Sequence, residues 1–295
     1  MQLIEENKWK SLIESLKTDF NNLETNKERA KRILKERIIE AVKKNAVDNC
    51  GVLFSGGVDS TLIAFILKKI NIKFTCYSVG LENAQDLQFA EKVASALSFD
   101  LKTKVITLEE FEQIVKKVVK ILNEPDVTKV GVGSVVYAAS LLAKKDKVNV
   151  LFSGLGSEEL FAGYERHLVA FGNNNFEALH KECWDGLINM WKRDLDRDFR
   201  ITKNVGVDVR APFLDVDVIK TAMSIHPVYK IDKSIKKIIV REIAEDFGIP
   251  KEFSWRPKKA AQYGSKFIIG IDKLAKNKGF KLKRDYLQNL VDVQL

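Results

Sequence analysis

The stretch "VLFSGGVDSTLIAFIL" (residues 52–67) predicts a buried strand, a glycine turn and a buried helix in direct succession. Apolar runs lie on both sides of the turn, and the second run is long enough for a helix. Gly56 and Gly57 let the backbone turn tightly and bring its N–H groups close to an anion, and the helix start adds the positive end of its dipole. Asp59 requires a separate explanation, because a carboxylate alone would repel that anion.

Short runs rich in β-branched and aromatic residues alternate with helical patterns in the first half of the chain. The runs are residues 50–54, 72–79, 101–108 and 148–152. Alternation of this kind predicts an α/β fold, in which helices cover both faces of a parallel sheet. Beyond residue 165 we expect helices and no further strand. We therefore expect N-terminal helices (1–45), an α/β core (46–165) and a helical lobe (166–295).

Composition excludes several classes of protein. The chain has 295 residues, of which 45% are hydrophobic, and this content suits a folded core. Charged or polar residues interrupt every apolar run before the roughly 18 residues that a membrane helix needs. The first residues are acidic where a secretory signal is basic, so we expect a cytoplasmic protein and no membrane partner. Three scattered cysteines and three dispersed histidines indicate neither disulfides nor a zinc site.

The formal net charge of +9 is compatible with nucleic acid, an anionic small ligand or a solvated basic surface. Lysine runs such as "KSIKK" (233–237) lack the interleaved aromatic residues of single-strand binding surfaces. The sequence therefore does not favour nucleic acid as the partner.

A second glycine motif, "SGLGSEELFAGY" (153–164), follows the fourth predicted strand. Ligands bind outside the carboxyl ends of the strands in parallel α/β sheets, so both motifs fall where a ligand is expected. Mg²⁺ prefers a few carboxylates together with phosphate oxygens and water. Asp59 and Glu158 are candidate ligands of one ion if their two strands are neighbours. The alternative is that both carboxylates only favour helix N-termini through the dipole.

These motifs resemble a known family. "SGGVDS" (55–60) looks like the pyrophosphate loop of the N-type ATP pyrophosphatases, and "LFSGLGSEELFAGY" looks like the second motif of the asparagine synthetase synthetase domain. "VRAPFLD" (209–215), "KKIIVREIA" (236–244) and "WRPKKAAQYGS" (255–265) resemble the later landmarks of that domain, in the same order. The resemblance covers most of residues 36–267. It implies an adenine nucleotide α-hydrolase-like fold.

The resemblance also implies a reaction. A substrate carboxylate would attack the α-phosphorus of ATP and release pyrophosphate, and an amine or ammonia would then open the acyl-adenylate. In this family's pattern Lys258 matches the catalytic lysine, while Asp59 and Glu158 hold Mg²⁺. The residues that match the pyrophosphate-binding positions are Ser55, Gly56, Gly57 and Ser60. Those that match positions around adenine and ribose are Leu53, Val79 and Gly154.

Two departures from the family's pattern concern the acceptor half of the reaction. The chain begins Met1-Gln2 and lacks the glutaminase domain with its N-terminal cysteine, so glutamine would serve only through a separate glutaminase subunit. Leu155 stands where asparagine synthetases typically carry a glutamate. A leucine cannot accept a proton or pair with an ammonium, and this argues against aspartate as the acyl substrate.

Three functions remain open from the sequence. The first is an ATP- and Mg²⁺-dependent, AMP-forming amide ligase that acts on a small-molecule carboxylate. The second is a tRNA-modifying enzyme that uses a similar loop to adenylate a base, which the positive charge favours. The third is a non-catalytic nucleotide-binding subunit, for which Leu155 is the evidence.

Overall fold

A computed structural model describes residues 4–257 and 260–293. Its centre is a parallel sheet with the strand order β3-β2-β1-β4-β5. The strands are β1 (Cys50–Leu53), β2 (Phe74–Gly80), β3 (Leu101–Val105), β4 (Val150–Phe152) and β5 (Asp208–Arg210). The predicted α/β class and parallel sheet are thereby confirmed.

The expectation that no strand follows residue 165 is wrong. Asp208–Arg210 forms the edge strand β5, which pairs with β4 in parallel. It has only three residues, and none of them is buried. Such a segment carries no apolar run, so its pairing could not be read from hydrophobic pattern. The domain division at residue 165 stays a prediction.

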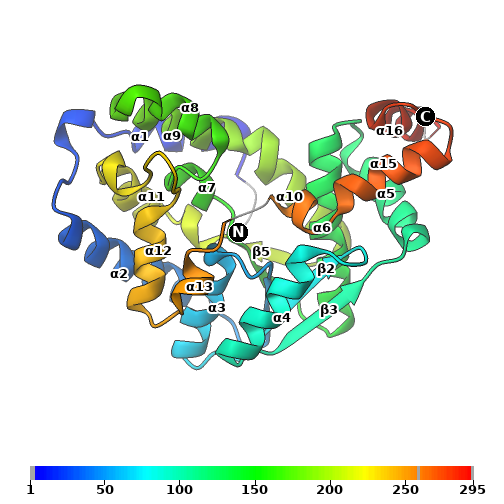
Figure 1. Ribbon diagram of the computed structural model, residues 1–295, viewed down its shortest axis with the longest axis horizontal. Helices are drawn as coiled ribbons and strands as arrows, with labels where there is room; N and C mark the ends of the chain where they lie inside the picture. The colour runs from blue at the N-terminus through cyan, green and yellow to red at the C-terminus, as the bar shows by residue number, and fades with distance from the viewer. Residues whose placement is uncertain (1–3, 258–259, 294–295) are drawn as a thin grey trace.

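Helices cover both faces of the sheet and build a large helical region beside it (Figure 1). The helices before β4 are α1 (Glu6–Ser15), α2 (Lys27–Asn45), α3 (Val58–Lys69), α4 (Gln85–Leu97), α5 (Leu108–Leu122) and α6 (Val127–Lys145). Those between β4 and β5 are α7 (Ser157–Leu160), α8 (Glu165–Phe171), α9 (Phe176–Met190) and α10 (Asp196–Val205), with a π-helical turn at Trp191–Leu195. After β5 come α11 (Val216–Ser224), α12 (Ile238–Asp246), α13 (Lys251–Ser254), α14 (Ala261–Gly264), α15 (Phe267–Asn277) and α16 (Lys283–Asp292).

Two buried apolar clusters lie on opposite faces of the sheet. Val52 of β1 and Phe152 of β4 belong to the cluster that includes α2, α3 and α9. Tyr77 of β2 and Leu151 of β4 belong to the other cluster, with α5, α6 and α15. Successive strand residues point to opposite faces, and for this reason neighbours such as Leu151 and Phe152 fall in different clusters.

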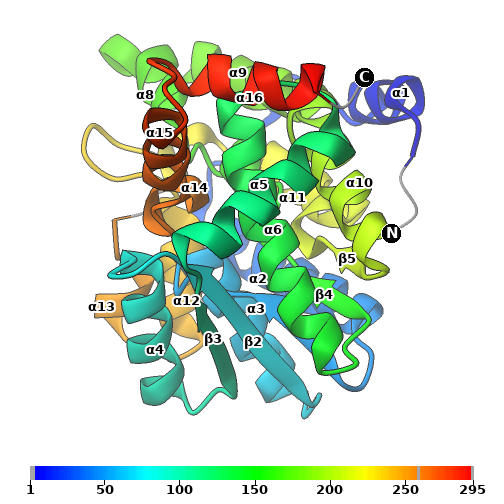
Figure 2. The same cartoon turned by 90° about the vertical axis from the view of Figure 1, so that its right-hand side faces the viewer.

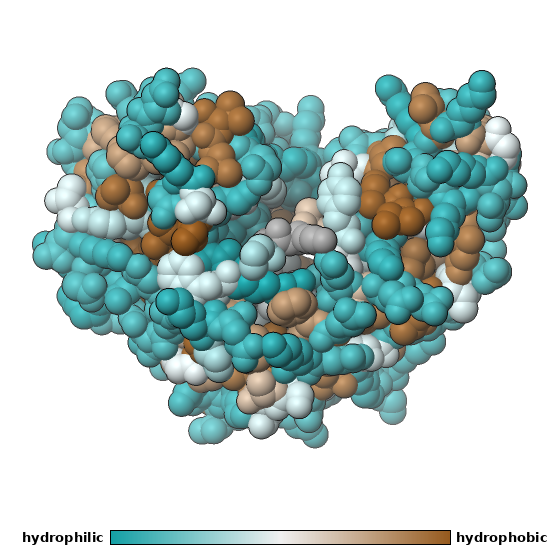
Figure 3. All heavy atoms as spheres, viewed as in Figure 1, coloured by the Kyte–Doolittle hydropathy of each residue, from teal (hydrophilic) through white to brown (hydrophobic). Residues whose placement is uncertain are grey.

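The helices rise from the sheet in two groups, and β5 lies between these groups (Figure 1). One group contains α1, α8, α9 and α11, and the other contains α5, α6, α15 and α16. Figure 2 shows the same arrangement from the side, with the sheet at the opposite end of the molecule from α16. The surface is hollowed between the two groups (Figure 3).

Helix α6 is long and apolar enough to cross a membrane when length and composition alone are considered. Half of its most apolar window is buried inside the fold. It packs against α5, α10, α15 and strand β2. These contacts are those of a core helix of the second group.

A fully buried lysine lies in the first group of helices. Lys230 is 0% exposed, and its Nζ lies 3.7 Å from the sulfur of Met223, which is a weak acceptor. No ion pair joins Lys230 to a carboxylate within the described residues. Burial lowers the pKa of Lys230 to about 8, and the nearby Cys183 opposes this shift only in part. The buried ammonium is therefore a net cost to the folded state at neutral pH.

We expect Lys230→Met to stabilise the protein at pH 7 by about 1–3 kcal/mol, because it replaces a poorly compensated buried charge with an apolar side chain of similar length. The pKa of Lys230 in the folded state lies below the ordinary lysine value of 10.5, so the unfolded chain binds the proton more tightly. The gain is therefore full below pH 8 and shrinks as the pH rises from 8 towards 10.5.

Urea unfolding at pH 7 and pH 9.5 measures both effects. The exposed Lys220→Met variant is the control, and its free energy of unfolding should change by less than about 0.5 kcal/mol. A loss of stability in Lys230→Met at both pH values would contradict the expectation.

Candidate functional site: a buried carboxylate pair between two glycine loops

The two glycine motifs meet because their strands are neighbours. β1 and β4 pair in parallel, with Val52 opposite Phe152, so both loops leave the same edge of the sheet. A Cβ on Gly154 would lie 2.8 Å from the Cβ of Asp59. Glycine at this position thus allows the second loop to pack directly on the first. The strand adjacency that a shared ion at Asp59 and Glu158 requires is present.

Asp59 and Glu158 face the same cationic atom. The Nζ of Lys237 lies 2.7 Å from Oδ2 of Asp59 and 2.7 Å from Oε1 of Glu158. The Ser157 hydroxyl donates to Oδ1 of Asp59 at 2.5 Å. The side chains of Lys237, Asp59 and Glu158 are 2%, 6% and 12% exposed. Buried charges of this kind persist because each one is paired.

Lys237 was missed in the sequence, where it belongs to a lysine run that is typical of a solvated surface. It lies directly before α12, in a left-handed backbone conformation with φ 62°. Arg241, one turn later, donates to the carbonyl oxygens of Lys236 and Ser254, each at 2.7 Å, and to that of Arg256 at 3.0 Å. Burial lowers the pKa of Arg241, and the nearby carboxylates of Asp59 and Glu158 oppose this shift. The clearest sequence signal for Lys237 was its place in the "KKIIVREIA" motif.

The adjacent glutamate has a different environment. Glu159 is 1% exposed and pairs with Arg193. Burial raises the pKa of Glu159, the nearby Asp194 raises it further, and the charge of Arg193 opposes both. Glu158 is therefore the member of this glutamate pair whose carboxylate meets Asp59 at Lys237.

The predicted pyrophosphate residues lie together in one turn at the start of α3. Gly56 has φ +67°, and a Cβ there would lie 3.0 Å from the carbonyl oxygen of Phe89. The Gly57 N–H donates to the Ser55 hydroxyl at 3.4 Å, and the Ser60 hydroxyl donates to the Gly57 carbonyl oxygen at 3.2 Å. No side chain caps the N-terminus of α3, a helix of 12 residues. Its first N–H groups can therefore donate to an anion.

The residues predicted to surround adenine and ribose lie at the same edge of the sheet. Leu53 ends β1 and is half-buried, whereas Val79 is the penultimate residue of β2 and is buried. Gly154 lies in the loop after β4, against Asp59. The topology thus gathers three segments at the ends of neighbouring strands.

Arg256 ties the C-terminal motif to the first loop. Its Nη1 donates to the carbonyl oxygen of Ser55 at 2.9 Å, and its Nη2 lies 3.2 Å from Oδ1 of Asp86. The guanidinium stacks on the ring of Phe89, 3.6 Å from the centroid. Lys258, two residues later, lies outside the described residues. The structure therefore joins the "WRPKK" motif to "SGGVDS" through Arg256, which the sequence did not single out.

The donor set fits a divalent cation that arrives with phosphate. Asp59 and Glu158 both lie within hydrogen-bond distance of one atom, so one cation at that point can contact both carboxylates. No group of three or more His, Cys, Asp or Glu side chains suited to a metal ion occurs among the described residues. Two carboxylates supplemented by phosphate oxygens and water form the type of site that Mg²⁺ prefers.

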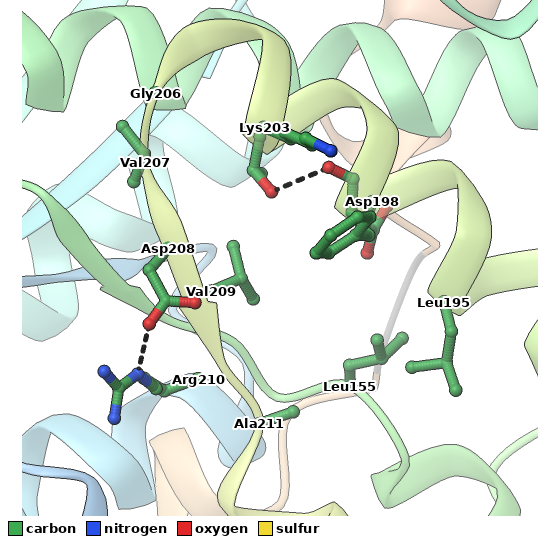
Figure 4. Close-up of a pocket in the computed structure, with 12 residues that line it drawn as sticks. Leu155, Leu195, Asp198, Lys203, Gly206, Val207, Asp208, Val209, Arg210 and Ala211 are labelled. Atoms are coloured by element: carbon green, nitrogen blue, oxygen red, sulfur yellow. Dashed lines mark hydrogen bonds and ion pairs between the residues drawn. The ribbon is translucent and has the colours of Figure 1, made fainter. Parts of the chain in front are cut away.

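A pocket of about 570 Å³ is lined by Leu155 of the second loop and extends along β5 and α10. Figure 4 shows Leu155, Leu195 and Ala211 toward one end and Gly206 at the other, with Val209 between them. The ion pair between Arg210 and Asp208, 2.7 Å long, lies on its rim. Neither Asp59 nor Lys237 lines this pocket, so it is a separate chamber next to the second loop.

Comparison with known proteins places the chain in a family. The asparagine synthase family model matches residues 34–179 and 173–278. A putative glutamine-hydrolyzing asparagine synthetase of Methanocaldococcus jannaschii is 37% identical over 90% of this chain and 56% of that protein. The glutamine-hydrolyzing asparagine synthetases of Homo sapiens and Bos taurus are 33% and 32% identical over 85% of this chain and 45% of theirs.

The chain thus spans about half the length of each of these relatives. Among solved structures, the NMN synthetase of Francisella tularensis matches with a TM-score of 0.44 and 12% identity, over 90% of this chain and 94% of that one. The resemblance of the ordered motifs to this family is confirmed by the family model and the relatives. This chain belongs to the asparagine synthase family and contains an asparagine synthetase-like ligase domain.

Proposed function

We propose that the chain is an ATP- and Mg²⁺-dependent ligase that adenylates a small carboxylic acid and transfers the acyl group to ammonia or an amine. The observation that carries this proposal is the convergence of Asp59 and Glu158 on one cation position beside the uncapped start of α3. The family uses ATP, which supports the choice of nucleotide. The acyl substrate is the part that the family alone leaves open.

In this proposal Asp59 and Glu158 hold the Mg²⁺ ion, which when bound neutralises the phosphate charge and favours departure of pyrophosphate. The N–H groups at the start of α3 and the hydroxyls of Ser55 and Ser60 donate to the same phosphates. Fixed donors of this kind stabilise the developing charge without reorganising during the reaction. Leu53, Val79 and Gly154 are proposed to surround the nucleoside.

The proposed reaction has two steps, adenylation and acyl transfer. A carboxylate oxygen of the acid attacks the α-phosphorus, and the bond to the oxygen that bridges the α- and β-phosphorus breaks. Pyrophosphate leaves with that electron pair. The amine nitrogen then attacks the acyl carbon of the mixed anhydride, AMP leaves with the bridging oxygen, and the nitrogen loses a proton. We assign Lys258 to steadying the negative charge of the acyl-transfer step, on the strength of its match to the family pattern.

The acceptor side of the site is mostly apolar. Leu155 opens onto the pocket that Leu195, Phe199 and Val209 also line. The apolar part of this lining suits a neutral amine or ammonia, and the charged Asp198, Lys203, Asp208 and Arg210 line the rest of the pocket. We therefore place the entry of the nitrogen donor in this pocket, and aspartate is not the proposed acyl substrate.

The relatives are named glutamine-hydrolyzing, and this chain matches only about half of their length. We propose a separate glutaminase subunit as the nitrogen source when free ammonia is scarce. Co-purification of a glutaminase, together with glutamine-dependent amide formation by the mixture, would support that partner. Amide formation from ammonia alone at its physiological concentration would make the partner unnecessary.

The first expected outcome concerns adenylation. In a panel of carboxylic acids, at least one acid should drive exchange of labelled pyrophosphate into ATP. Asp59→Ala should reduce this exchange by about 100-fold or more, since it removes one of two carboxylates from the proposed metal site. Lys258→Ala should retain nucleotide binding and lose amide formation.

The control for Asp59→Ala is Asp48→Ala, which removes an exposed aspartate from the turn before β1 and should exchange like the wild type. Exchange by Asp59→Ala at the wild-type rate would show that the first loop does not bind the nucleotide phosphates. Tight ATP binding without exchange for any acid would favour the non-catalytic subunit instead.

A second outcome concerns the contact between the loops. Gly154→Ala should weaken binding of α,β-methylene-ATP with Mg²⁺ by about tenfold, because its Cβ would meet the Asp59 Cβ at 2.8 Å and push the loops apart. Calorimetry measures the affinity, and circular dichroism checks that the variant folds. Gly172→Ala is the matched control, since a Cβ there meets nothing within 4 Å. Equal affinities of the two variants would contradict the expectation.

A third outcome concerns the pocket. Leu155→Trp should keep pyrophosphate exchange within about threefold of the wild type and reduce amide formation by about tenfold or more, because the indole would fill the proposed entry of the amine. Leu141→Trp, at a partly exposed position of α6, is the control. An equal loss of both reactions would place the acyl substrate, and not the amine, in this pocket.

A further inference from the structure

The chain carries its own cation at the point where the carboxylates of the proposed metal site converge. Lys237 Nζ contacts Asp59 Oδ2 and Glu158 Oε1 at 2.7 Å each, and Ser157 Oγ at 3.2 Å. The second oxygen of Asp59 accepts the Ser157 hydroxyl. An incoming metal ion must therefore displace bonds that already exist.

An ammonium and a divalent ion cannot share this position. Both need the same carboxylate oxygens, and two cations so close in a buried site repel each other strongly. Lys237 neutralises part of the charge that would attract a free metal ion from solution. Removing a charge partner from a buried pair is costly, so the metal alone gains little by replacing the lysine.

The backbone of Lys237 indicates that its position is imposed by its surroundings. A lysine with φ 62° and ψ 35° adopts a left-handed conformation that is unfavourable for a non-glycine residue. Two contacts hold the segment there: Arg241 donates to the Lys236 carbonyl oxygen, and the Ile238 N–H donates to the Lys230 carbonyl oxygen at 2.9 Å.

A glycine makes room for this arrangement. A Cβ on Gly163 would lie 1.7 Å from Oε2 of Glu158 and 2.5 Å from Cε of Lys237. The second loop therefore leaves space for a long aliphatic stem beside the glutamate. Because four rotatable carbons separate the ammonium from the backbone, Nζ can move while the start of α12 stays in place.

We propose that Lys237 is a positioning residue that occupies the cation position in the nucleotide-free protein and transfers its ammonium to the phosphates when the nucleotide brings the metal. The inference rests on the proposed function, since it takes ATP and Mg²⁺ as the ligands. The nucleotide supplies new acceptors for the ammonium and new ligands for the metal, so exchange becomes favourable only when both arrive. The metal and the nucleotide then bind with positive coupling, and this coupling is reciprocal.

Binding of Mn²⁺, followed by the loss of the free-ion electron paramagnetic resonance signal, tests this exchange without any catalytic turnover. The wild type should bind Mn²⁺ weakly alone and at least about tenfold more tightly with α,β-methylene-ATP. Lys237→Met should bind Mn²⁺ without nucleotide at least about tenfold more tightly than the wild type, since the carboxylate pair loses its built-in cation. The ratio between the Mn²⁺ affinities of this variant with and without the nucleotide should therefore be smaller than in the wild type.

Lys236→Met is the matched control, because it removes the same charge from the preceding residue, whose side chain pairs with Glu165 on α8. It should bind Mn²⁺ like the wild type. Lys237→Met with Glu158→Gln should lose the nucleotide-independent Mn²⁺ binding, which would show that the ion occupies this pair. This double variant also removes one of the two buried carboxylate charges that pair with Lys237.

The wild type alone can overturn the inference. If it binds Mn²⁺ equally tightly with and without the nucleotide analogue, Lys237 does not compete with the metal ion for the carboxylates. Unchanged Mn²⁺ binding in a folded Lys237→Met variant would lead to the same conclusion. Failure of the proposed function is a distinct result, in which the wild type binds neither the analogue nor Mn²⁺ in its presence.

Discussion

The buried cluster of Asp59, Lys237 and Glu158 is the constraint on which the site depends. Its ionic side chains come from three segments, and 178 positions separate Asp59 from Lys237 in the sequence. A buried charge is tolerated only when it is paired, so these segments must meet for any of them to be buried. The cluster therefore couples the first loop, the second loop and the start of α12 into one unit.

The parallel sheet makes this meeting possible. β1 and β4 are neighbours, although two strands and several helices separate them along the chain, and their carboxyl ends lie at one edge. Three glycines then allow the two loops and Lys237 to approach one another. Gly56 turns the first loop, Gly154 packs on Asp59, and Gly163 leaves room for Lys237. Arg241 and Arg256 tie the C-terminal segments to the same place through backbone carbonyls. Charge pairing and close backbone approach thus act together.

Much of the fold follows from local pattern. The strands that begin near residues 50, 74, 101 and 150 carry apolar runs, and their alternation with helices specifies a parallel sheet. Strand β5 could not be predicted from the hydrophobic pattern, because three half-buried residues shortly before a proline are typical of a turn. The burial of Lys237 could not be predicted for a similar reason. A lysine in a basic run looks like a solvated side chain, and nothing nearby in the sequence indicates that it is 2% exposed.

The sequence by itself determined the strand, loop and helix of "VLFSGGVDSTLIAFIL" and the family, and it predicted the two carboxylates as ligands of one cation. These features are local, because backbone turns and apolar periodicity depend on residues a few positions apart. Only the tertiary structure decided which cation meets the carboxylates, which glutamate of the pair faces Asp59, and that Leu155 lines a mostly apolar pocket. The physical reason is that a buried charge can take its partner from any part of the chain, so the partner becomes identifiable only once the sheet has brought distant segments together.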